Sequence, residues 1–264
     1  MNARPPVADE PAESLSTLLA DVTLDPDESL AGQIQRSLEE LIVGVRLLPG
    51  RRISEKEVSE CLGASKTPVR EALIGLQNAG LVTVVPKSGT YVTPIRIARY
   101  LEACFVRLRL ESGAVRRAAE RHERTERQTE LEALLDRQAE AIGRDDDRRF
   151  FLLDEALHEA FFRAAGVPGV WPVLVRTQSD VLRIRHLKRT RGIRRVERVL
   201  ADHRRIVDAI GAGDPDAAEA ALVRHIGSLD NELERLAEHP ELMDFIDAQD
   251  RSGGRPRADA ALVR

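Results

Sequence analysis

Aromatic residues are scarce in this sequence, and cysteine is nearly absent. Phe, Trp and Tyr together make up 3% of the 264 residues, whereas Ala, Leu, Arg and Glu are abundant. That composition favours helices over strands. The two cysteines, Cys61 and Cys104, lie far apart and form no CxxC motif. We therefore expect no disulfide framework and no cysteine metal site, but two reduced residues in a cytoplasmic protein.

Long apolar runs are also missing. No stretch reaches the about 18 consecutive apolar residues that a membrane-spanning helix needs. The first residues, MNARPPVADEPAES, contain no apolar signal core. Hydrophobic residues still make up 42% of the chain, which is enough to build a buried core. The sequence therefore predicts a soluble cytoplasmic protein, outside the membrane and long enough for two domains.

The net charge of −4 argues against nucleic-acid binding until its distribution is considered. Residues 1–28 carry one Arg and seven acidic residues, whereas residues 29–96 carry nine Lys or Arg against six acidic residues. Because local charge attracts phosphate groups, the basic segment 29–96 is the part of the chain suited to nucleic acid.

Three short helices followed by a hairpin are predicted in that basic segment. Helical spacing of apolar residues begins at Leu30 and ends before the turn at Pro49-Gly50. Ser54 and Glu57 form a capping box for a second helix, which Gly63 ends. A third helix is expected to begin at Ser65, capped by its hydroxyl, and a β-rich hairpin follows over residues 81–92. This order is typical of a winged helix-turn-helix.

Beyond Pro94 the pattern is helical almost to the end, with helices expected near 96–121, 125–142, 146–165, 168–190, 193–211 and 214–238. The predicted fold is therefore mostly α, with an antiparallel all-α bundle of six or seven helices after the winged helix-turn-helix. We expect a disordered arm at 1–28, a DNA-binding domain at 29–95, a helical effector-binding and dimerisation domain at 96–250, and a disordered tail at 251–264.

The third predicted helix has the features of a DNA-reading helix. Lys66, Thr67 and Arg70 lie on its first turns, opposite the apolar Val69 and Leu73, and donors there are placed to reach guanine edges or phosphates. An isolated basic helix with this pattern would more often be a solvated face. Lys56 on the preceding helix, and Lys87 with Gly89 in the wing, are placed to reach the DNA backbone.

The run from Leu48 to Val92 resembles the DNA-binding domain of the GntR family. The matching residues include Pro49-Gly50, Ser54-Glu55, Leu62-Gly63, the run from Ser65 to Leu73, Gly80-Leu81-Val82 and Gly89. The family usually has Arg where this chain has Lys66, which lacks the bidentate fork. The resemblance implies that double-stranded DNA is bound through Lys56, Ser65, Lys66, Thr67 and Arg70, with Lys87 and Gly89 in the wing.

A possible metal site is spread over three helices of the second domain. Asp154 and His158 are four residues apart and share one helix face, and His203 and His225 lie on two later helices. Three imidazoles and one carboxylate would suit a divalent transition metal, with Zn²⁺ first and Ni²⁺ or Mn²⁺ as alternatives. Spacing alone leaves open a local Asp–His hydrogen bond and two surface histidines.

Residues 98–240 resemble the FCD ligand-sensing domain of the FadR-like branch of the same family. The matches include Arg107 with Leu110-Glu111, Asp154-x-x-x-His158, His203-x-x-Ile206 and His225. The resemblance implies that Asp154, His158, His203 and His225 bind a metal, and that Arg107 pairs with a small carboxylate effector. The family often has Asn-Pro where this chain has Val167-Pro168.

The leading hypothesis is therefore a metabolite-responsive homodimer that represses transcription from a near-palindromic operator. Two alternatives stay open at this point. In the first, the second domain is a metal-dependent hydrolase or lyase, although no general base accompanies the predicted ligands. In the second, it is a dimerisation module with a structural metal or none. The effector, operator, native metal and direction of regulation are not encoded in any motif.

Overall fold

The computed structural model describes residues 13–121, 126–193, 196–227, 234 and 236–252. Contacts divide the chain into two units, each described here by itself. The first unit comprises residues 1–97, 179–191 and 239–264, and the second comprises residues 98–178 and 192–238. Both units are built mainly from helices, which confirms the predicted fold class.

The three helices of the winged helix-turn-helix begin where the sequence predicts, but the first of them ends at Val43, before the predicted turn at Pro49-Gly50. Ser29 accepts a hydrogen bond from the backbone of Gly32, and Ser54 accepts one from Glu57, so both helices after these residues are capped. Gly63 adopts a φ of 63° at the end of the second, a left-handed conformation that favours glycine. The helices are α2 (Leu30–Val43), α3 (Glu55–Leu62) and α4 (Lys66–Asn78).

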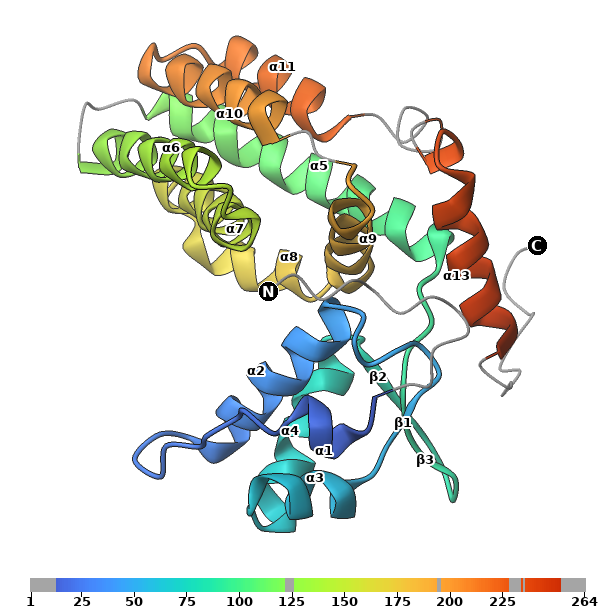
Figure 1. Ribbon diagram of the computed structural model, residues 1–264. Helices are drawn as coiled ribbons and strands as arrows, with labels where there is room; N and C mark the ends of the chain where they lie inside the picture. Colours follow the sequence, from blue (N-terminus) through green and yellow to red (C-terminus); the bar gives the residue numbers. More distant parts are fainter. Residues whose placement is uncertain (1–12, 122–125, 194–195, 228–233, 235, 253–264) are drawn as a thin grey trace. The chain divides into compact units, whose positions relative to one another are not determined.

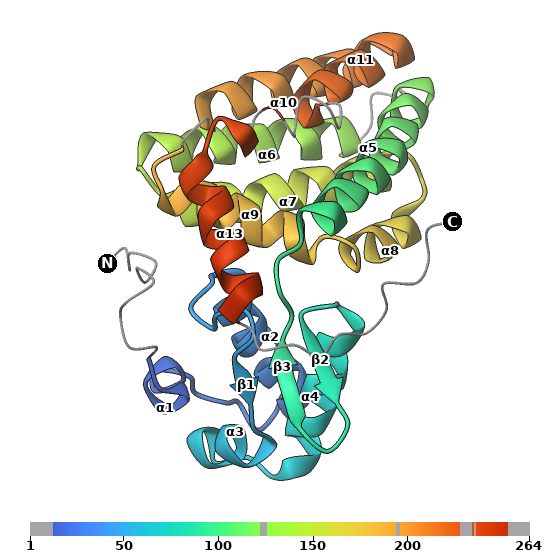
Figure 2. The same cartoon turned by 90° about the vertical axis from the view of Figure 1, so that its right-hand side faces the viewer.

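Three short strands complete the winged helix-turn-helix. They are β1 (Arg52–Ile53), β2 (Val82–Val85) and β3 (Gly89–Val92), in the order β1-β3-β2 with antiparallel pairing (Figure 2). Val84 pairs with Thr90 in the hairpin. Leu76, Ile34 and Leu38 are fully buried between the helices and this sheet, so the first unit holds α4 against its own core.

Part of the predicted disordered arm is ordered. A one-turn helix, α1 (Leu15–Leu18), is capped by Ser14, and its Leu15 and Leu18, with Leu19, are buried in the core of the first unit. These leucines are too few to show a helical period, which is why the sequence alone missed them. Residues 1–12 and 253–264 lie outside the described residues.

Two helices from beyond residue 97 also belong to the first unit: α9 (Ser179–Thr190) and α13 (Pro240–Ser252). Arg183 of α9 is completely buried, and its guanidinium donates to the backbone oxygen of Thr93 at 2.6 Å and to that of Pro94 at 3.4 Å. Arg183 also pairs with Asp180 one turn earlier. The residues directly after β3 are therefore held by a helix that lies far away in the sequence.

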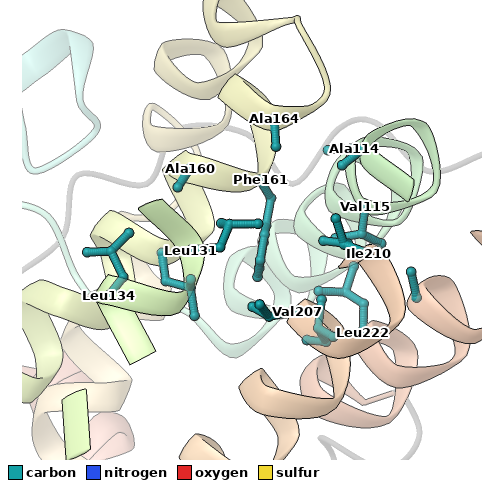
Figure 3. Close-up of a cluster of buried hydrophobic side chains, with 14 of the residues drawn as sticks. Ala114, Val115, Leu131, Leu134, Ala160, Phe161, Ala164, Val207, Ile210 and Leu222 are labelled. Carbon is teal, nitrogen blue, oxygen red and sulfur yellow. The ribbon is translucent and has the colours of Figure 1, made fainter. Parts of the chain in front are cut away.

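The second unit is a helical bundle. Phe161 is fully buried at its centre, where its ring extends from α7 toward Val207 of α10 (Figure 3). The helices are α5 (Ile97–Glu120), α6 (Glu126–Gly143), α7 (Asp147–Ala164), η1 (Pro168–Val170), α8 (Trp171–Val175), α10 (Val196–Gly211) and α11 (Pro215–Ile226). None of the described helices is long and apolar enough to cross a membrane.

Two predicted helices are wrong in extent. The helix expected over 168–190 is broken into η1, α8 and α9, because Pro168 and Pro172 each occupy a first turn and start a new short helix. The helix expected over 214–238 ends at Ile226, because Gly227 follows with a φ of 90°.

Candidate metal centre and DNA-reading surface

The four predicted metal ligands come together in the second unit. Asp154 and His158 lie on α7, His203 on α10 and His225 on α11. One oxygen or nitrogen atom from each side chain lies within 4.8 Å of the others. Asp154, His158 and His203 are completely buried, and His225 is partly buried. Helix packing therefore brings together the four side chains that the sequence placed on three separate helices.

The distances within this cluster are short and nearly even. His225 Nε2 lies 3.3 Å from His203 Nε2 and 3.3 Å from His158 Nε2. The Asp154 carboxylate lies 3.5 Å from His203 Nε2 and 4.0 Å from His158 Nε2. All three imidazoles thus direct the same ring nitrogen toward one point.

Two further side chains contact the outer nitrogens of the histidines. Glu111 on α5 lies 2.5 Å from His158 Nδ1, and Gln138 on α6 lies 2.8 Å from His203 Nδ1. Both residues are completely buried. Glu111 belongs to the Arg107 and Leu110-Glu111 match noted in the sequence, but its contact with His158 was not predicted. Nothing in the sequence around Gln138 indicates that it would contact a histidine.

Arg107 lies one helical turn before Glu111 and donates through Nε to its carboxylate at 2.7 Å. The Arg107 side chain is 8% exposed. Its Nη2 atom is buried and makes no hydrogen bond among the described residues. A buried guanidinium nitrogen without a partner is costly, so it marks a position where an acceptor would be stabilised.

The electrostatic environment favours ionised Glu111 and neutral His225. Burial opposes ionisation of Glu111, but the charge of Arg107 and the hydrogen bonds from His158 and Arg107 outweigh it and lower the pKa of Glu111 to about 2. Burial lowers the pKa of His225 well below its usual range, and His203 and His158 lower it further. His225 is therefore a neutral imidazole at pH 7, which is the form that binds a metal.

The predicted DNA-contacting residues of the first unit lie on its surface. Lys66, Thr67 and Arg70 are exposed on the first turns of α4, whose opposite face is buried. Ser65 precedes them, and its hydroxyl does not cap the helix, contrary to the prediction. That hydroxyl is instead exposed beside the helix N-terminus, where phosphate groups are favoured.

The flanking basic residues are exposed as well. Lys56 on α3 pairs with Glu60 at 3.6 Å, an exposed contact that contributes little stability. In the wing, Lys87 has a φ of 64° and Gly89 a φ of 142°. The φ of Gly89 favours glycine there, and a Cβ atom would also lie 2.7 Å from Arg52 Nε, so the Arg52 side chain would have to move.

Comparisons with known proteins agree with this architecture. Residues 30–92 match the gntR family of bacterial regulatory proteins, and residues 102–228 match the FCD domain. An HTH-type transcriptional regulator from an unstable DNA locus of Streptomyces ambofaciens is 34% identical over 225 residues, covering 79% of this chain and 87% of that protein. The HTH-type transcriptional repressor RspR of Escherichia coli is 32% identical over 220 residues, covering 83% and 95%.

A solved structure supports the fold. Escherichia coli McbR/YncC superposes with a TM-score of 0.65 at 22% identity, covering 80% of this chain and 99% of that one. The matched relatives are regulators of transcription, which removes the enzyme alternative. The resemblance predicted from the residues is confirmed: this chain belongs to the gntR family of bacterial transcription regulators, as a DNA-binding member with a C-terminal FCD domain.

Proposed function

We propose that the protein represses transcription and is released from DNA by a small carboxylate, which binds at a divalent metal ion in the FCD domain. The observation that carries this proposal is the cluster of Asp154, His158, His203 and His225, whose ligand atoms converge within 4.8 Å in the interior of the bundle. A shared cation would stabilise buried imidazoles and a carboxylate at such distances, because it would bind the lone pairs that otherwise face one another.

The donor set and its spacing fit a transition metal. Nitrogen ligands at about 2.0–2.1 Å from a tetrahedral Zn²⁺ lie about 3.3 Å from one another. The two nitrogen–nitrogen distances from His225 in this cluster are both 3.3 Å. Three imidazoles and one carboxylate suit Zn²⁺, and also Ni²⁺ or Mn²⁺, which prefer more ligands and would keep additional positions for water.

Arg107 supports a carboxylate as the effector class. Its Nε is occupied by Glu111, whereas Nη2 remains buried without an acceptor among the described residues. The charge of Asp154 acts on Arg107, which places the guanidinium within electrostatic reach of the metal ligands. When bound, the metal would supply a Lewis-acidic anchor for one carboxylate oxygen, and Arg107 would donate a charged hydrogen bond to the effector.

The DNA-binding part of the proposal follows from α4. A homodimer would place one copy of α4 in each half of a near-palindromic operator. Lys66, Thr67 and Arg70 would contact bases, and Ser65, Lys56, Lys87 and Gly89 would contact the backbone. The effector would shift the arrangement of the two reading helices by binding one arrangement more tightly than the other. The relative RspR is itself named a repressor.

A thermal-shift screen of the full chain tests the proposal. The protein is stripped with EDTA, reloaded with Zn²⁺, Ni²⁺ or Mn²⁺, and mixed with a panel of small carboxylates. We expect the metal to raise the melting temperature, and one carboxylate class to raise it further only when the metal is present. That carboxylate should then weaken DNA binding.

Matched variants separate sensing from a structural role. His203→Ala should abolish both shifts, and His239→Ala, which changes a histidine of the first unit that pairs with Glu241, should change neither. Stabilisation by metal alone, with no carboxylate effect and unaltered DNA affinity, would indicate the dimerisation module with a structural metal.

A further inference from the structure

In two of the clustered histidines, His158 and His203, the partner of Nδ1 decides which ring nitrogen carries the proton. A neutral imidazole has one N–H donor and one acceptor nitrogen, and a metal binds only the acceptor. His158 and His203 each make a second contact through Nδ1, to Glu111 and Gln138 respectively. The chemistry of those two partners therefore sets the tautomer of each ring before any metal arrives.

The orientation of Gln138 is fixed by a backbone carbonyl. Its Nε2 atom donates to the backbone oxygen of Leu153 at 3.0 Å, a group that only accepts. The amide nitrogen must therefore face Leu153, and the amide oxygen must face His203 Nδ1 at 2.8 Å. Because an amide oxygen cannot donate, His203 Nδ1 must carry the proton, and its Nε2 then holds a lone pair.

Glu111 acts in the same way on His158. One carboxylate oxygen accepts from Arg107 Nε at 2.7 Å, and the other lies 2.5 Å from His158 Nδ1. A carboxylate paired with a buried guanidinium is an acceptor. His158 Nδ1 is therefore the donor, and the lone pair of the neutral ring lies on Nε2, which faces His225.

His225 lacks such a partner. Its Nδ1 is buried and makes no hydrogen bond among the described residues, and its Nε2 lies 3.3 Å from both other Nε2 atoms. The three histidines thus differ: two rings are held in one tautomer from outside the cluster, and the third is not.

We infer that Gln138 and Glu111 are positioning residues that hold His203 and His158 with protonated Nδ1 and unprotonated Nε2, so that two metal-binding nitrogens are prepared in the metal-free protein. This inference rests on the proposed metal site. Outer partners of this kind commonly change metal affinity by about 10–100-fold when they are removed.

The direct test is a long-range ¹H–¹⁵N correlation spectrum of the imidazoles in full-length, metal-free protein. We expect His158 and His203 to show protonated Nδ1. Gln138→Met keeps an unbranched side chain but removes the acceptor, so His203 should gain the Nε2-protonated form while His158 stays unchanged. Gln138→Glu restores an acceptor and should restore the His203 tautomer.

Zinc affinity gives a second readout. Gln138→Met should weaken Zn²⁺ binding by about 10–100-fold, and Gln138→Glu should recover most of it. Gln128→Met changes a glutamine on the same helix that contacts Glu132 and the Val207 backbone instead, so it should leave tautomers and affinity unchanged.

The outcomes distinguish this inference from the proposed function. Nε2-protonated His203 in the parent protein, or an unchanged tautomer in Gln138→Met, overturns the inference whether or not metal binds. If Gln138→Met does not fold, the parent and Gln138→Glu spectra still decide it. Absence of Zn²⁺ binding with the expected tautomers would contradict the metal proposal but support the role of Gln138.

Discussion

Arg70 and Glu55 join α4, the helix proposed to read DNA, to α3, the helix before it. Arg70 Nη2 donates to Glu55 at 2.9 Å, and Arg70 Nε donates to the other carboxylate oxygen at 3.2 Å. This bidentate contact lowers the pKa of Glu55, chiefly through the hydrogen bond itself. The guanidinium of Arg70 therefore has a defined orientation at the protein surface before DNA is present, and a bound guanine or phosphate would compete with Glu55 for it.

Arg70→Ala is expected to weaken specific DNA binding and leave the fold intact, because Arg70 is exposed and α4 is held by its buried face. Loss of one bidentate base contact costs about 1–3 kcal/mol, a roughly 5- to 150-fold loss of operator affinity per site. Fluorescence anisotropy on genomic fragments selected by the parent protein measures this. Arg36→Ala, which removes an exposed arginine of α2 that pairs with Glu28, is the control. Equal affinities for Arg70→Ala and the parent would show that α4 does not read the operator.

Arg107→Lys is expected to weaken the response to carboxylates while metal binding persists. Lysine retains the positive charge beside Glu111 but lacks the second nitrogen group that Arg107 keeps buried without a partner. The carboxylate concentration that produces half of the thermal shift should rise at least about tenfold, as expected for one lost charged hydrogen bond. Calorimetry of Zn²⁺ binding to the same variant is the control. An unaltered carboxylate response would exclude Arg107 from the effector site.

The first unit is expected to lose stability between pH 6.5 and about 4 because of His186. Burial, followed by the charge of Arg189, lowers the pKa of His186 from 6.5 to about 4. The unfolded chain therefore binds a proton in this window that the folded chain does not, so the stability present above pH 6.5 is lost as the pH falls toward 4. Melting temperatures of EDTA-treated parent and His186→Gln protein, measured from pH 7.5 to 4.5, should converge as the pH falls. Parallel curves would contradict the assignment.

Arg183→Met is expected to destabilise the first unit by about 3 kcal/mol, as breaking a buried ion pair commonly does. Methionine fills similar space but leaves the backbone oxygens of Thr93 and Pro94 without the Arg183 donor and removes one ion-pair partner of Asp180. Urea unfolding followed by circular dichroism measures the loss. Arg185→Met, two residues away and only partly buried, should cost less than about 1 kcal/mol. Similar losses in both variants would mean that the Thr93 and Pro94 contacts add no stability.

Sequence rules that concern neighbouring residues predicted the order of helices and strands in the winged helix-turn-helix and one pair of side chains in the candidate metal site. α3 begins after Ser54 and ends at Gly63, as capping rules predict. Asp154 and His158 share one face of α7 because they are four residues apart. That His203 and His225 meet them was implied only by family resemblance, because the meeting depends on how three helices pack.

Other features have no local signal. Gln138 lies among the polar residues of α6, and its role depends on the Leu153 carbonyl fifteen residues later. Arg183 lies in a strongly basic stretch, where a solvated side chain is the usual outcome. Its burial becomes visible only when Thr93 and Pro94 are seen beside it. Long-range partners, rather than composition, decide both positions.

The placement of α9 limits how this regulator can be taken apart. Residues 179–191 lie inside the segment that matches the FCD domain, yet they pack as part of the unit that reads DNA. A gene fragment ending near residue 95 would encode the winged helix-turn-helix without Arg183 of α9. A chimera that exchanged residues 102–228 for those of another regulator would pack a foreign helix against the winged helix-turn-helix of this chain. A domain exchange in this chain therefore has to keep α9 together with the winged helix-turn-helix. The border between the two units is crossed more than once along the sequence, so no single cut point separates them.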